Sequence, residues 1–261
     1  TTLYTNIKHD DLFRALSYII SIAYSSSRFP LIAISGNNSR WCAKTSLISL
    51  NEPQLMQSIR FLVKNTWFTV GNLLFNQIIG IPMGTNSAPN LANLFLFALE
   101  FRFLKSNLRN DYYLCKSLRY TYRYLDDITV INDNHQFDNI IHEMYGDDLE
   151  LSKVNNYDFQ ANVLDINICI VNNKFATKLF DKRRDFSFSI NMFPYFSSNI
   201  SSNVLYGTFY SQVIRYCRIC SSSVDAVNEV KNLLSALIYK GYDGYMLRKT
   251  LRRTINKHNV V

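Results

Sequence analysis

The chain has 261 residues, 48% of them hydrophobic and 18% charged, so it is apolar enough to bury a substantial core and general disorder is not expected. Lys and Arg number 28 against 20 Asp and Glu, a net charge of +8 that favours a polyanionic partner. No apolar run is long enough to span a bilayer, and the five cysteines form no closely spaced disulfide framework, which favours a reducing compartment.

In the first half of the chain, the hydrophobic patterns predict a mixed order of helices and short strands. The expected elements are a strand over residues 1–7, a helix over 10–25 capped by Asp10, a strand over 31–34, an irregular loop over 35–50, a helix that begins after Asn51, and a hairpin over 66–77. The second helix has Pro53 in its first turn. Its inward residues are expected to be Leu55, Ile59, Leu62 and Val63.

The second half is predicted to be richer in helix toward its end. The expected elements are an apolar helix from about 89 to 107 with Leu91, Leu94 and Phe95 inward, an acidic hairpin over 122–131, a helix over 137–145, strands near 149–151, over 163–171 and over 175–180, and helices over 204–220, 224–239 and 245–258. The dipeptide Asn172-Asn173 is expected to turn the chain between the last two strands. A connector rich in Ser, Asn and Pro over 191–203 suggests two domains, 1–192 and 193–261.

The acidic hairpin has the most unusual charge pattern. Aromatic and β-branched residues flank Asp126-Asp127, which predicts a hairpin with both aspartates in its turn. The strands are expected to be buried, and a buried pair of like charges takes up protons unless a cation neutralises it. Mg²⁺ supplies such a cation, because it prefers one or two carboxylates together with water and phosphate oxygens. The alternative interpretation is an ordinary solvated turn.

A loop rich in Gly and Pro precedes the apolar helix that begins near residue 89. Its sequence over 80–89 is Gly-Ile-Pro-Met-Gly-Thr-Asn-Ser-Ala-Pro, and Ser87 is the expected helix cap. Small residues let a ligand approach the backbone closely, and the N-terminus of a helix favours anions. The alternative is a tight turn into a core helix.

The last stretch of the chain concentrates positive charge. From residue 231 to the end, the sequence has seven basic residues and one acidic residue, Asp243. Several of them recur four residues apart and therefore share one side of the last predicted helix, opposite Leu247 and Leu251. These basic residues are Arg248, Lys249, Arg252 and Arg253. With so few acids to balance them, contact with a phosphate backbone is favoured over a merely solvated face.

Taken in order, three motifs give the chain a family resemblance. Leu-Tyr-Thr-Asn-Ile at residues 3–7, then Gly-Ile-Pro-Met-Gly-Thr opening a helix, then Tyr-Leu-Asp-Asp at 124–127 resemble a reverse transcriptase, with the nearest likeness to Penelope-like retroelements. The resemblance covers essentially the whole chain. It implies an α+β fold with a right-hand polymerase palm, an antiparallel sheet with helices on one face, followed by an α-helical thumb.

The resemblance also implies an activity, a cofactor and partners. The activity is RNA-directed DNA polymerisation, in which a primer 3′-hydroxyl attacks the α-phosphorus of a deoxynucleoside triphosphate and pyrophosphate leaves. Two Mg²⁺ ions would serve it, with Mn²⁺ as a possible substitute, because a pair of divalent ions stabilises both the attacking and the leaving oxygens. The partners are an RNA template, a DNA primer and nucleotides, and the expected location is intracellular, in the nucleus.

Site residues follow from the matching motifs. Asp126 is implied as a direct metal ligand, and Asp127 is either a second ligand or a carboxylate behind the first. Tyr4 would stack under the sugar and reject a 2′-hydroxyl, with a core tyrosine as the alternative. The resemblance implies that the floor of the nucleotide site is formed by Pro82, Met83 and Gly84. Lys153 is either a proton donor near the pyrophosphate or a plain surface lysine. Nucleic-acid contacts are expected from Tyr124, Lys178, Lys182 and Arg183 as well as from the four basic residues of the last helix.

One departure from the family pattern bears on activity. Aligning Tyr4 with the aromatic residue of the first motif places that motif's metal-binding Asp upstream of Thr1, so we expect a palm-and-thumb portion that is a poor or inactive catalyst by itself. Three alternatives remain open at this stage. They are a non-catalytic nucleic-acid-binding remnant of a reverse transcriptase, a telomere-extending reverse transcriptase, and a purely structural basic α+β domain.

Overall fold

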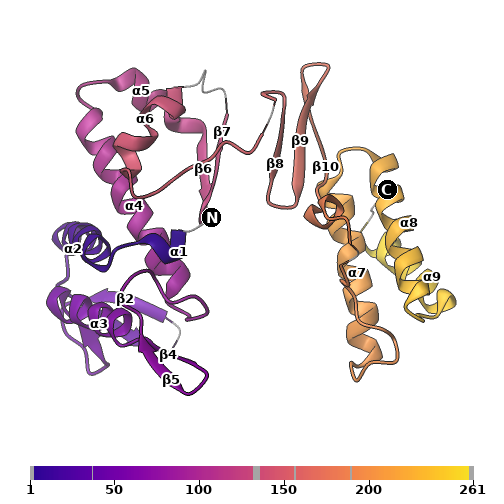
Figure 1. The fold of residues 1–261 in the computed structure, drawn as a ribbon, viewed down its shortest axis with the longest axis horizontal. Coiled ribbons are helices and arrows are strands. Elements are labelled where there is room, and N and C mark those ends of the chain that lie inside the picture. The colour runs from indigo at the N-terminus through magenta and orange to yellow at the C-terminus, as the bar shows by residue number, and fades with distance from the viewer. Residues whose placement is uncertain (1–2, 37, 132–135, 156, 189, 259–261) are drawn as a thin grey trace. The chain divides into compact units, whose positions relative to one another are not determined.

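The computed structural model describes residues 3–36, 38–131, 136–155, 157–188 and 190–258. It has an α+β architecture with small antiparallel sheets and a helical C-terminal region (Figure 1). The chain divides into two compact units, Thr1–Leu151 and Ser152–Val261, and each is considered by itself. This division follows spatial contacts, whereas the boundary between residues 192 and 193 follows composition and stays a prediction.

The first unit is built around one long helix. Its helices are α1 (Leu3–Asn6), α2 (His9–Ser26), α3 (Glu52–Lys64), α4 (Ala88–Asn107), α5 (Tyr112–Ser117), the short 3-10 helix η1 (Leu118–Tyr120) and α6 (Gln136–Tyr145). Helix α4 packs against α2 and α6 (Figure 1). Leu12, Leu16 and Ala92 are fully buried where α2 meets α4, so the apolar faces of both helices pack into one hydrophobic core.

Three small antiparallel sheets complete the first unit. Their strands are β1 (Leu31–Ser35), β2 (Asn38–Cys42), β3 (Ser49–Leu50), β4 (Trp67–Val70), β5 (Leu73–Asn76), β6 (Thr121–Tyr124) and β7 (Asp127–Val130). Strand β1 pairs with both β2 and β3, β4 pairs with β5, and β6 pairs with β7. The hairpins predicted over 66–77 and over 122–131 are confirmed.

Several predictions for the first unit are confirmed and several are wrong. The start of α3 is confirmed, because Asn51 Oδ1 accepts the Gln54 N–H at 2.9 Å while the Asn51 N–H donates to Gln54 Oε1 at 3.0 Å. The strand over 1–7 is wrong: Leu3–Asn6 is helical, and Leu3 and Ile7, four residues apart, are both buried. The loop over 35–50 is also wrong, because β2 and β3 lie within it.

Four smaller predictions also fail. Lys8, not Asp10, occupies the N-cap position of α2. Leu62 and Leu94 are exposed rather than inward, because α3 and α4 bury other faces. The strand near 149–151 is absent from the described structure, where Leu149 and Leu151 instead pack their side chains against the first core. Leu149 and Leu151, two residues apart, fit the alternating pattern of a strand, but in the described structure this segment has no partner strand.

The second unit joins a three-stranded sheet to three helices. Its elements are β8 (Gln160–Val163), β9 (Ile166–Val171), β10 (Lys174–Leu179), the 3-10 helix η2 (Lys182–Asp185), α7 (Ser202–Ile219), α8 (Ser223–Tyr239) and α9 (Gly244–His258). Strand β9 lies between β8 and β10. The three predicted helices and the Asn172-Asn173 turn, with φ of 51° and 58°, are confirmed. The strand predicted over 163–171 is confirmed as β9 from Ile166 onward, but its predicted start is wrong, because a turn at Leu164, with φ of 54°, separates Val163, the last residue of β8, from β9.

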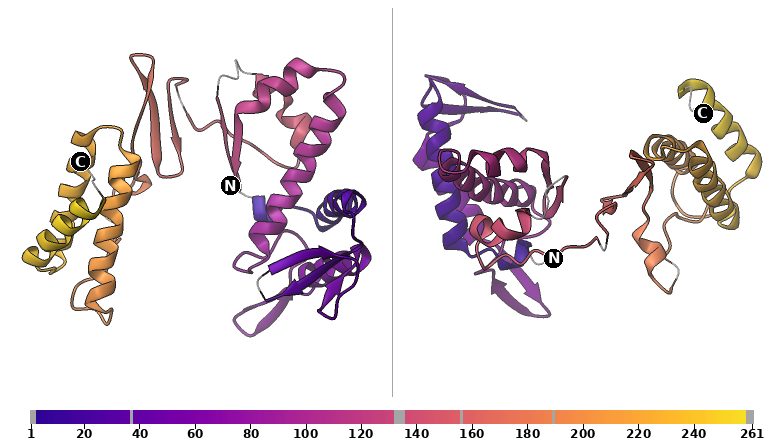
Figure 2. Two further views of the ribbon diagram at one scale, coloured as in Figure 1. Left: turned by 180° about the vertical axis from the view of Figure 1, so that it is seen from behind. Right: turned by 90° about the horizontal axis from the view of Figure 1, so that it is seen from above.

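Helix α7 connects the sheet of the second unit to the helical core. It lies against both α8 and α9 (Figures 1 and 2), and Phe209 and Val213 are buried there. Strand β10 is fixed to the end of α7, because the Thr177 N–H donates to Ser221 Oγ at 2.9 Å and the Ser221 N–H donates to the Thr177 carbonyl at 2.8 Å. No helix in the described part of the chain is long and apolar enough to cross a membrane.

Candidate active site

The two aspartates lie at the end of the β6–β7 hairpin, with a register one residue away from the predicted one. Tyr124 pairs with Asp127, so the turn consists of Leu125 and Asp126, and Asp127 is the first residue of β7. The positive φ of 54° falls on Leu125 and not on an aspartate. A leucine in this left-handed conformation costs about 1–2 kcal/mol, so other contacts have to hold the turn.

The expectation that both strands are buried is wrong for one face of the hairpin. Tyr122 and Tyr124 are 58% and 61% exposed, and Asp126 and Asp127 are exposed as well. Arg123 and its cross-strand partner Ile128 face the core instead, as the two-residue period of a strand requires. Two carboxylates in water repel each other by only about 1 kcal/mol, so the hairpin does not need a cation in order to fold.

A buried polar cluster holds the hairpin against α4. Arg123 Nε donates to Glu100 Oε1 at 2.5 Å and Arg123 Nη2 donates to Glu100 Oε2 at 3.2 Å. Arg123 Nη1 donates to Asn93 Oδ1 at 2.9 Å and to the Leu125 carbonyl at 3.2 Å. The Arg123 and Glu100 side chains are 14% and 20% exposed, so this pair is largely shielded from water.

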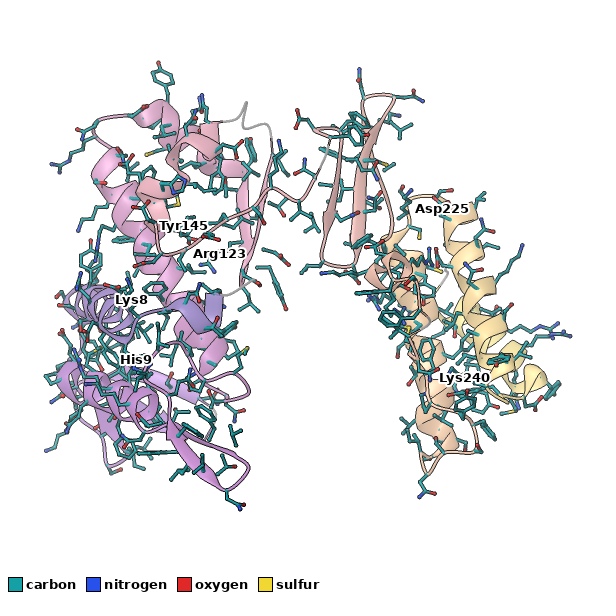
Figure 3. The ribbon with its side chains drawn as sticks, in the orientation of Figure 1. Lys8, His9, Arg123, Tyr145, Asp225 and Lys240 are labelled. Carbon is teal, nitrogen blue, oxygen red and sulfur yellow. The ribbon has the colours of Figure 1, made fainter. Side chains whose placement is uncertain are left out.

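Helix α6 adds a fourth residue, Tyr145, to this cluster. The Tyr145 hydroxyl donates to Glu100 Oε1 at 2.8 Å, and the side chains of Tyr145 and Arg123 both lie beside α4 (Figure 3). Burial, reinforced by the neighbouring Glu100 carboxylate, raises the pKa of Tyr145 far above its usual range, so the phenol stays protonated and remains a donor. We call Asn93, Glu100, Arg123 and Tyr145 the hairpin clamp.

The Gly/Pro-rich loop contacts the segment that contains Tyr4. The Ile81 N–H donates to the Tyr4 carbonyl at 2.6 Å, and the Gly80 N–H donates to the Ile7 carbonyl at 2.8 Å. A Cβ on Gly80, which has a φ of 83°, would lie 2.5 Å from the Tyr4 carbonyl oxygen, so only glycine allows this close approach. The structure therefore brings Tyr4 and the loop together through their backbones.

The next residues of the loop present an open surface before α4. Pro82 is buried, whereas Met83 is 70% exposed and Gly84, with a φ of 89°, has open space where a Cβ would be. Thr85 Oγ1 donates to the Pro82 carbonyl at 3.0 Å and holds the turn. Ser87 occupies the predicted N-cap position of α4, but its side chain makes no cap hydrogen bond.

The loop and the acidic turn are both attached to α4. The loop leads directly into Ala88, and the hairpin clamp contacts the helix at Asn93 and at Glu100, which lie five and twelve residues, and therefore about 7.5 and 18 Å, further along its axis. Tyr4 and Ile128 pack against the same hydrophobic core. One helix thus carries the small-residue loop at its start and supports the acidic hairpin from its second to its fourth turn.

The aspartates fit a magnesium ion only in part. Mg²⁺ is held by one or two carboxylates plus water and substrate phosphates, and Asp126 and Asp127 supply such carboxylates on exposed positions. Within the described ranges, no group of three or more His, Cys, Asp or Glu side chains is arranged to hold a metal. A two-ion site would need a further carboxylate beyond this pair.

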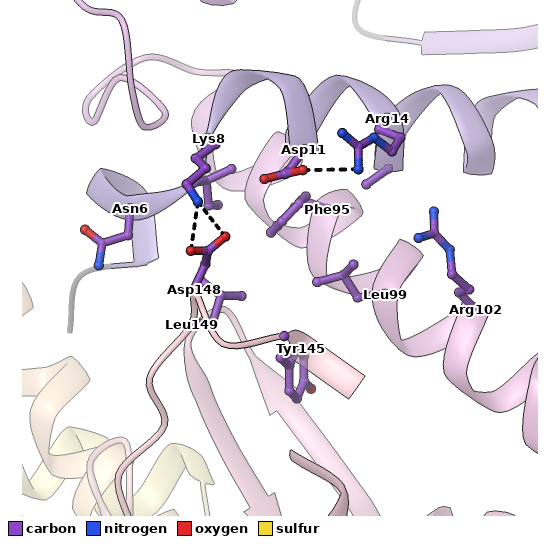
Figure 4. A pocket seen from close by; sticks show the side chains of 13 residues that line it. Asn6, Lys8, Asp11, Arg14, Phe95, Leu99, Arg102, Tyr145, Asp148 and Leu149 are labelled. Atoms are coloured by element: carbon purple, nitrogen blue, oxygen red, sulfur yellow. Dashed lines mark hydrogen bonds and ion pairs between the residues drawn. The ribbon is translucent and has the colours of Figure 1, made fainter. Parts of the chain in front are cut away.

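A separate cavity lies on another side of α4 (Figure 4). It has a volume of about 200 Å³ and is lined by α2, α4 and the segment after α6. Lys8 Nζ bonds both carboxylate oxygens of Asp148 at 2.9 Å across it, and Arg14 pairs with Asp11 at 3.5 Å. None of the site residues predicted from the sequence lines this cavity, although Tyr145 of the hairpin clamp does.

Of the predicted contact residues in the second unit, four precede α7, and their side chains differ in whether another protein group already binds them. Lys153 Nζ donates to Asp158 Oδ1 at 3.2 Å, while Lys178 and Lys182 are exposed. Arg183 is committed to Asp181, to which its Nε donates at 2.7 Å and its Nη2 at 2.5 Å. Lys182 and Arg183 share a cavity of about 410 Å³ with Arg215, which pairs with Asp165.

The predicted basic face of the last helix is present on α9. Leu247 is fully buried, Leu251 packs against the second core, and Thr254 is fully buried on the same side. The predicted basic residues all lie on exposed positions, and none has an ion pair within the described part of the chain. They are Arg248, Lys249, Arg252 and Arg253.

The sequence analysis missed the hairpin clamp, although a signal for it was available. Glu100 stands in the middle of an apolar helical run, and Arg123 alternates with tyrosines in a strand. Charged residues are rarely buried unless they are paired, so one acid and one base at core-facing positions indicate a buried pair. Neither spacing nor composition revealed that these two residues meet.

Comparison with known proteins adds no relative. The chain matches no protein-family model, no curated protein and no solved structure.

Proposed function

We propose that this chain is the palm and thumb portion of an RNA-directed DNA polymerase of the kind found in Penelope-like retroelements. The observation that carries the proposal is the arrangement along α4, where the small-residue loop bonded to Tyr4 precedes the helix and the Tyr-Leu-Asp-Asp hairpin is clamped to the second to fourth turns of the same helix. The order of these motifs in the sequence and their attachment to one helix support a shared site.

Each part of the arrangement has a chemical task in nucleotidyl transfer. Asp126 and Asp127 would hold Mg²⁺, which when bound activates the primer hydroxyl and stabilises charge on the leaving phosphate. Met83 and Gly84 leave the backbone open to a nucleotide, and the N-terminus of α4 favours its phosphates. Tyr4, held by Ile81, would pack under the sugar and exclude a 2′-hydroxyl. The exposed basic face of α9 would contact the phosphate backbone.

Primer extension tests this proposal. The chain is joined to an upstream segment that carries the first-motif aspartate and is given an RNA template, a DNA primer, deoxynucleotides and Mg²⁺. We expect synthesis that Asp126→Ala abolishes and that Asp147→Ala, a change at a nearly fully exposed carboxylate of the first unit, leaves intact. Synthesis that survives Asp126→Ala would refute the assignment of the catalytic carboxylate.

A second candidate is binding of nucleic acid without catalysis. The basic face of α9 favours it, because that face needs no metal, and a third carboxylate is missing from the described residues. Binding of an RNA–DNA hybrid, together with no extension by the protein that carries the upstream aspartate, would support this candidate over the polymerase.

A further inference from the structure

Arg123 uses all of its hydrogen-bonding capacity inside the protein. A guanidinium has five N–H donors in a rigid fork. In Arg123 they are directed to both oxygens of Glu100, to the side chain and, at 3.4 Å, the carbonyl of Asn93, and to the carbonyl of Leu125.

The Leu125 carbonyl is the informative acceptor. Leu125 has a φ of 54°, a conformation that leucine rarely adopts, and the next residue is Asp126. Strained conformations persist only where surrounding contacts determine them. The bond from Arg123 Nη1 at 3.2 Å is such a contact, and it fixes the peptide unit from which the Asp126 side chain projects.

The remaining members of the hairpin clamp fix Arg123 itself. Glu100 accepts from Arg123 in the two-pronged geometry that gives the strongest orientation, and Tyr145 donates to the same carboxylate from α6. Asn93 adds an amide oxygen from the preceding turns of α4. Two helices therefore determine where the guanidinium lies.

We propose that Arg123 is the positioning residue of the acidic turn: it transmits the rigid placement of α4 and α6 to Asp126 and Asp127 and so sets their affinity for a divalent cation. This inference rests on the proposed function, because it assumes that the two aspartates bind a metal. It assigns to Arg123, Glu100, Asn93 and Tyr145 a role behind the metal ligands rather than contact with substrate.

Electrostatics and positioning predict opposite effects when Arg123 is changed. If the guanidinium acted only through its positive charge, its removal would strengthen the binding of a cation to the nearby carboxylates. If it orients the turn, its removal weakens that binding, and loss of such supporting partners typically lowers metal affinity by about 10- to 100-fold. A variant that removes the guanidinium together with the Glu100 charge cancels most of the electrostatic effect, so weaker binding by that variant identifies the positioning role.

Terbium luminescence is a suitable readout. Tb³⁺ takes oxygen ligands as Mg²⁺ and Ca²⁺ do, and Tyr124, directly opposite Asp127 in the hairpin, is placed to sensitise its emission. The double variant Asp126→Asn/Asp127→Asn identifies the emission that comes from the turn. Tb³⁺ affinity is then compared between the wild-type chain and Arg123→Gln/Glu100→Gln, which removes both charges of the pair and leaves the net charge unchanged.

The second unit offers a matched control. Arg184 and Glu229 form another two-pronged pair, with N–O distances of 3.0 and 2.5 Å. We expect Arg123→Gln/Glu100→Gln to bind Tb³⁺ about tenfold more weakly and Arg184→Gln/Glu229→Gln to bind it like wild type. Tryptophan fluorescence monitors folding, because both tryptophans, Trp41 and Trp67, lie in the first unit.

Each result decides the question. Wild-type affinity in Arg123→Gln/Glu100→Gln overturns the role of Arg123 and leaves the metal site standing. Emission that does not depend on Asp126 and Asp127 removes the metal site, and the proposed function falls together with this inference. If the double variant does not fold, Arg123→Lys decides, because it keeps the charge but lacks the fork: weaker binding supports the role, and unchanged binding overturns it.

Discussion

The acidic turn of the first unit and the basic face of α9 are both exposed and charged, yet they are built differently. Behind the turn lies the hairpin clamp, where a largely buried Arg–Glu pair, an amide and a protonated phenol fix a strained residue. Behind the basic residues of α9 lie the apolar contacts of Leu247 and Leu251 and the buried Thr254, whose hydroxyl donates to the Thr250 carbonyl of the same helix.

This difference matches the task that is proposed for each surface. A metal ion demands ligands within a few tenths of an ångström of their ideal places, so its carboxylates need a rigid support. A phosphate backbone attracts cations over several ångströms and tolerates flexible side chains, so exposed lysines and arginines on a helix suffice. The presence of the hairpin clamp thus indicates that geometry matters at the turn, whereas charge suffices on α9.

The largest expected effect tests the rigid half of this comparison. Arg123→Met leaves Glu100 buried without its partner, which should lower the free energy of unfolding of the first unit by about 3–5 kcal/mol. Urea unfolding followed by tryptophan fluorescence measures this, because Trp41 and Trp67 report only on that unit. Arg252→Met on α9, an exposed position, should change stability by less than about 0.5 kcal/mol. Equal effects would contradict the distinction.

The second-largest expected effect concerns the basic face of α9. Replacing Arg248, Lys249, Arg252 and Arg253 by Gln removes four potential phosphate contacts and should make the slope of log K against log salt concentration shallower by about 3. Fluorescence anisotropy with an RNA–DNA hybrid measures it. Asp126→Asn/Asp127→Asn serves as the control and should leave the slope unchanged. A slope that does not respond to the four changes would remove α9 from the interface.

Sequence reasoning succeeded where local pattern decides structure. The helices α7, α8 and α9, the capping box at Asn51 and the Asn172-Asn173 turn follow from periodicity and local hydrogen bonding, and all are present. The same reasoning predicted which side of α9 is apolar, because the helical period fixes it. The palm and thumb identity, the cofactor and the site roles stay predictions.

Sequence reasoning failed where tertiary contacts decide the local structure. Residues 1–7 have the composition of a strand, but Leu3–Asn6 is helical where Tyr4 and Ile7 accept hydrogen bonds from the loop at 80–81. The turn register shifted by one residue because Arg123 supports a positive φ at Leu125, which no turn preference predicts for leucine. The contact between Glu100 and Arg123 spans 23 positions, so no local pattern shows that these two residues meet.

A smaller effect tests the outer part of the hairpin clamp. Tyr145→Phe removes one donor from Glu100 but keeps the ring in the core, so the free energy of unfolding of the first unit should fall by about 1–2 kcal/mol. Tryptophan-detected urea unfolding measures it. Tyr113→Phe is the control, since that ring is largely exposed and its change should be close to zero. A neutral Tyr145→Phe would mean that Arg123 alone satisfies Glu100.

The smallest expected effect tests whether the Arg183 side chain is available to a ligand, like the basic residues of α9, or is held by a carboxylate, like Arg123 in the hairpin clamp. Hydrogen bonds from the Arg183 side chain, opposed by partial burial, hold the pKa of Asp181 below its usual value. A carboxyl whose pKa is lower in the folded state stabilises the fold above its unfolded pKa, and that contribution disappears as pH falls through the folded pKa.

We therefore expect Asp181→Asn to weaken η2 by up to about 1 kcal/mol at pH 7 and to make no difference in strong acid, below both pKa values. Amide hydrogen exchange over residues 181–186 measures the local stability at each pH. An equal difference between Asp181→Asn and wild type at both pH values would show that Arg183 is not held by this carboxylate and is free to contact a phosphate.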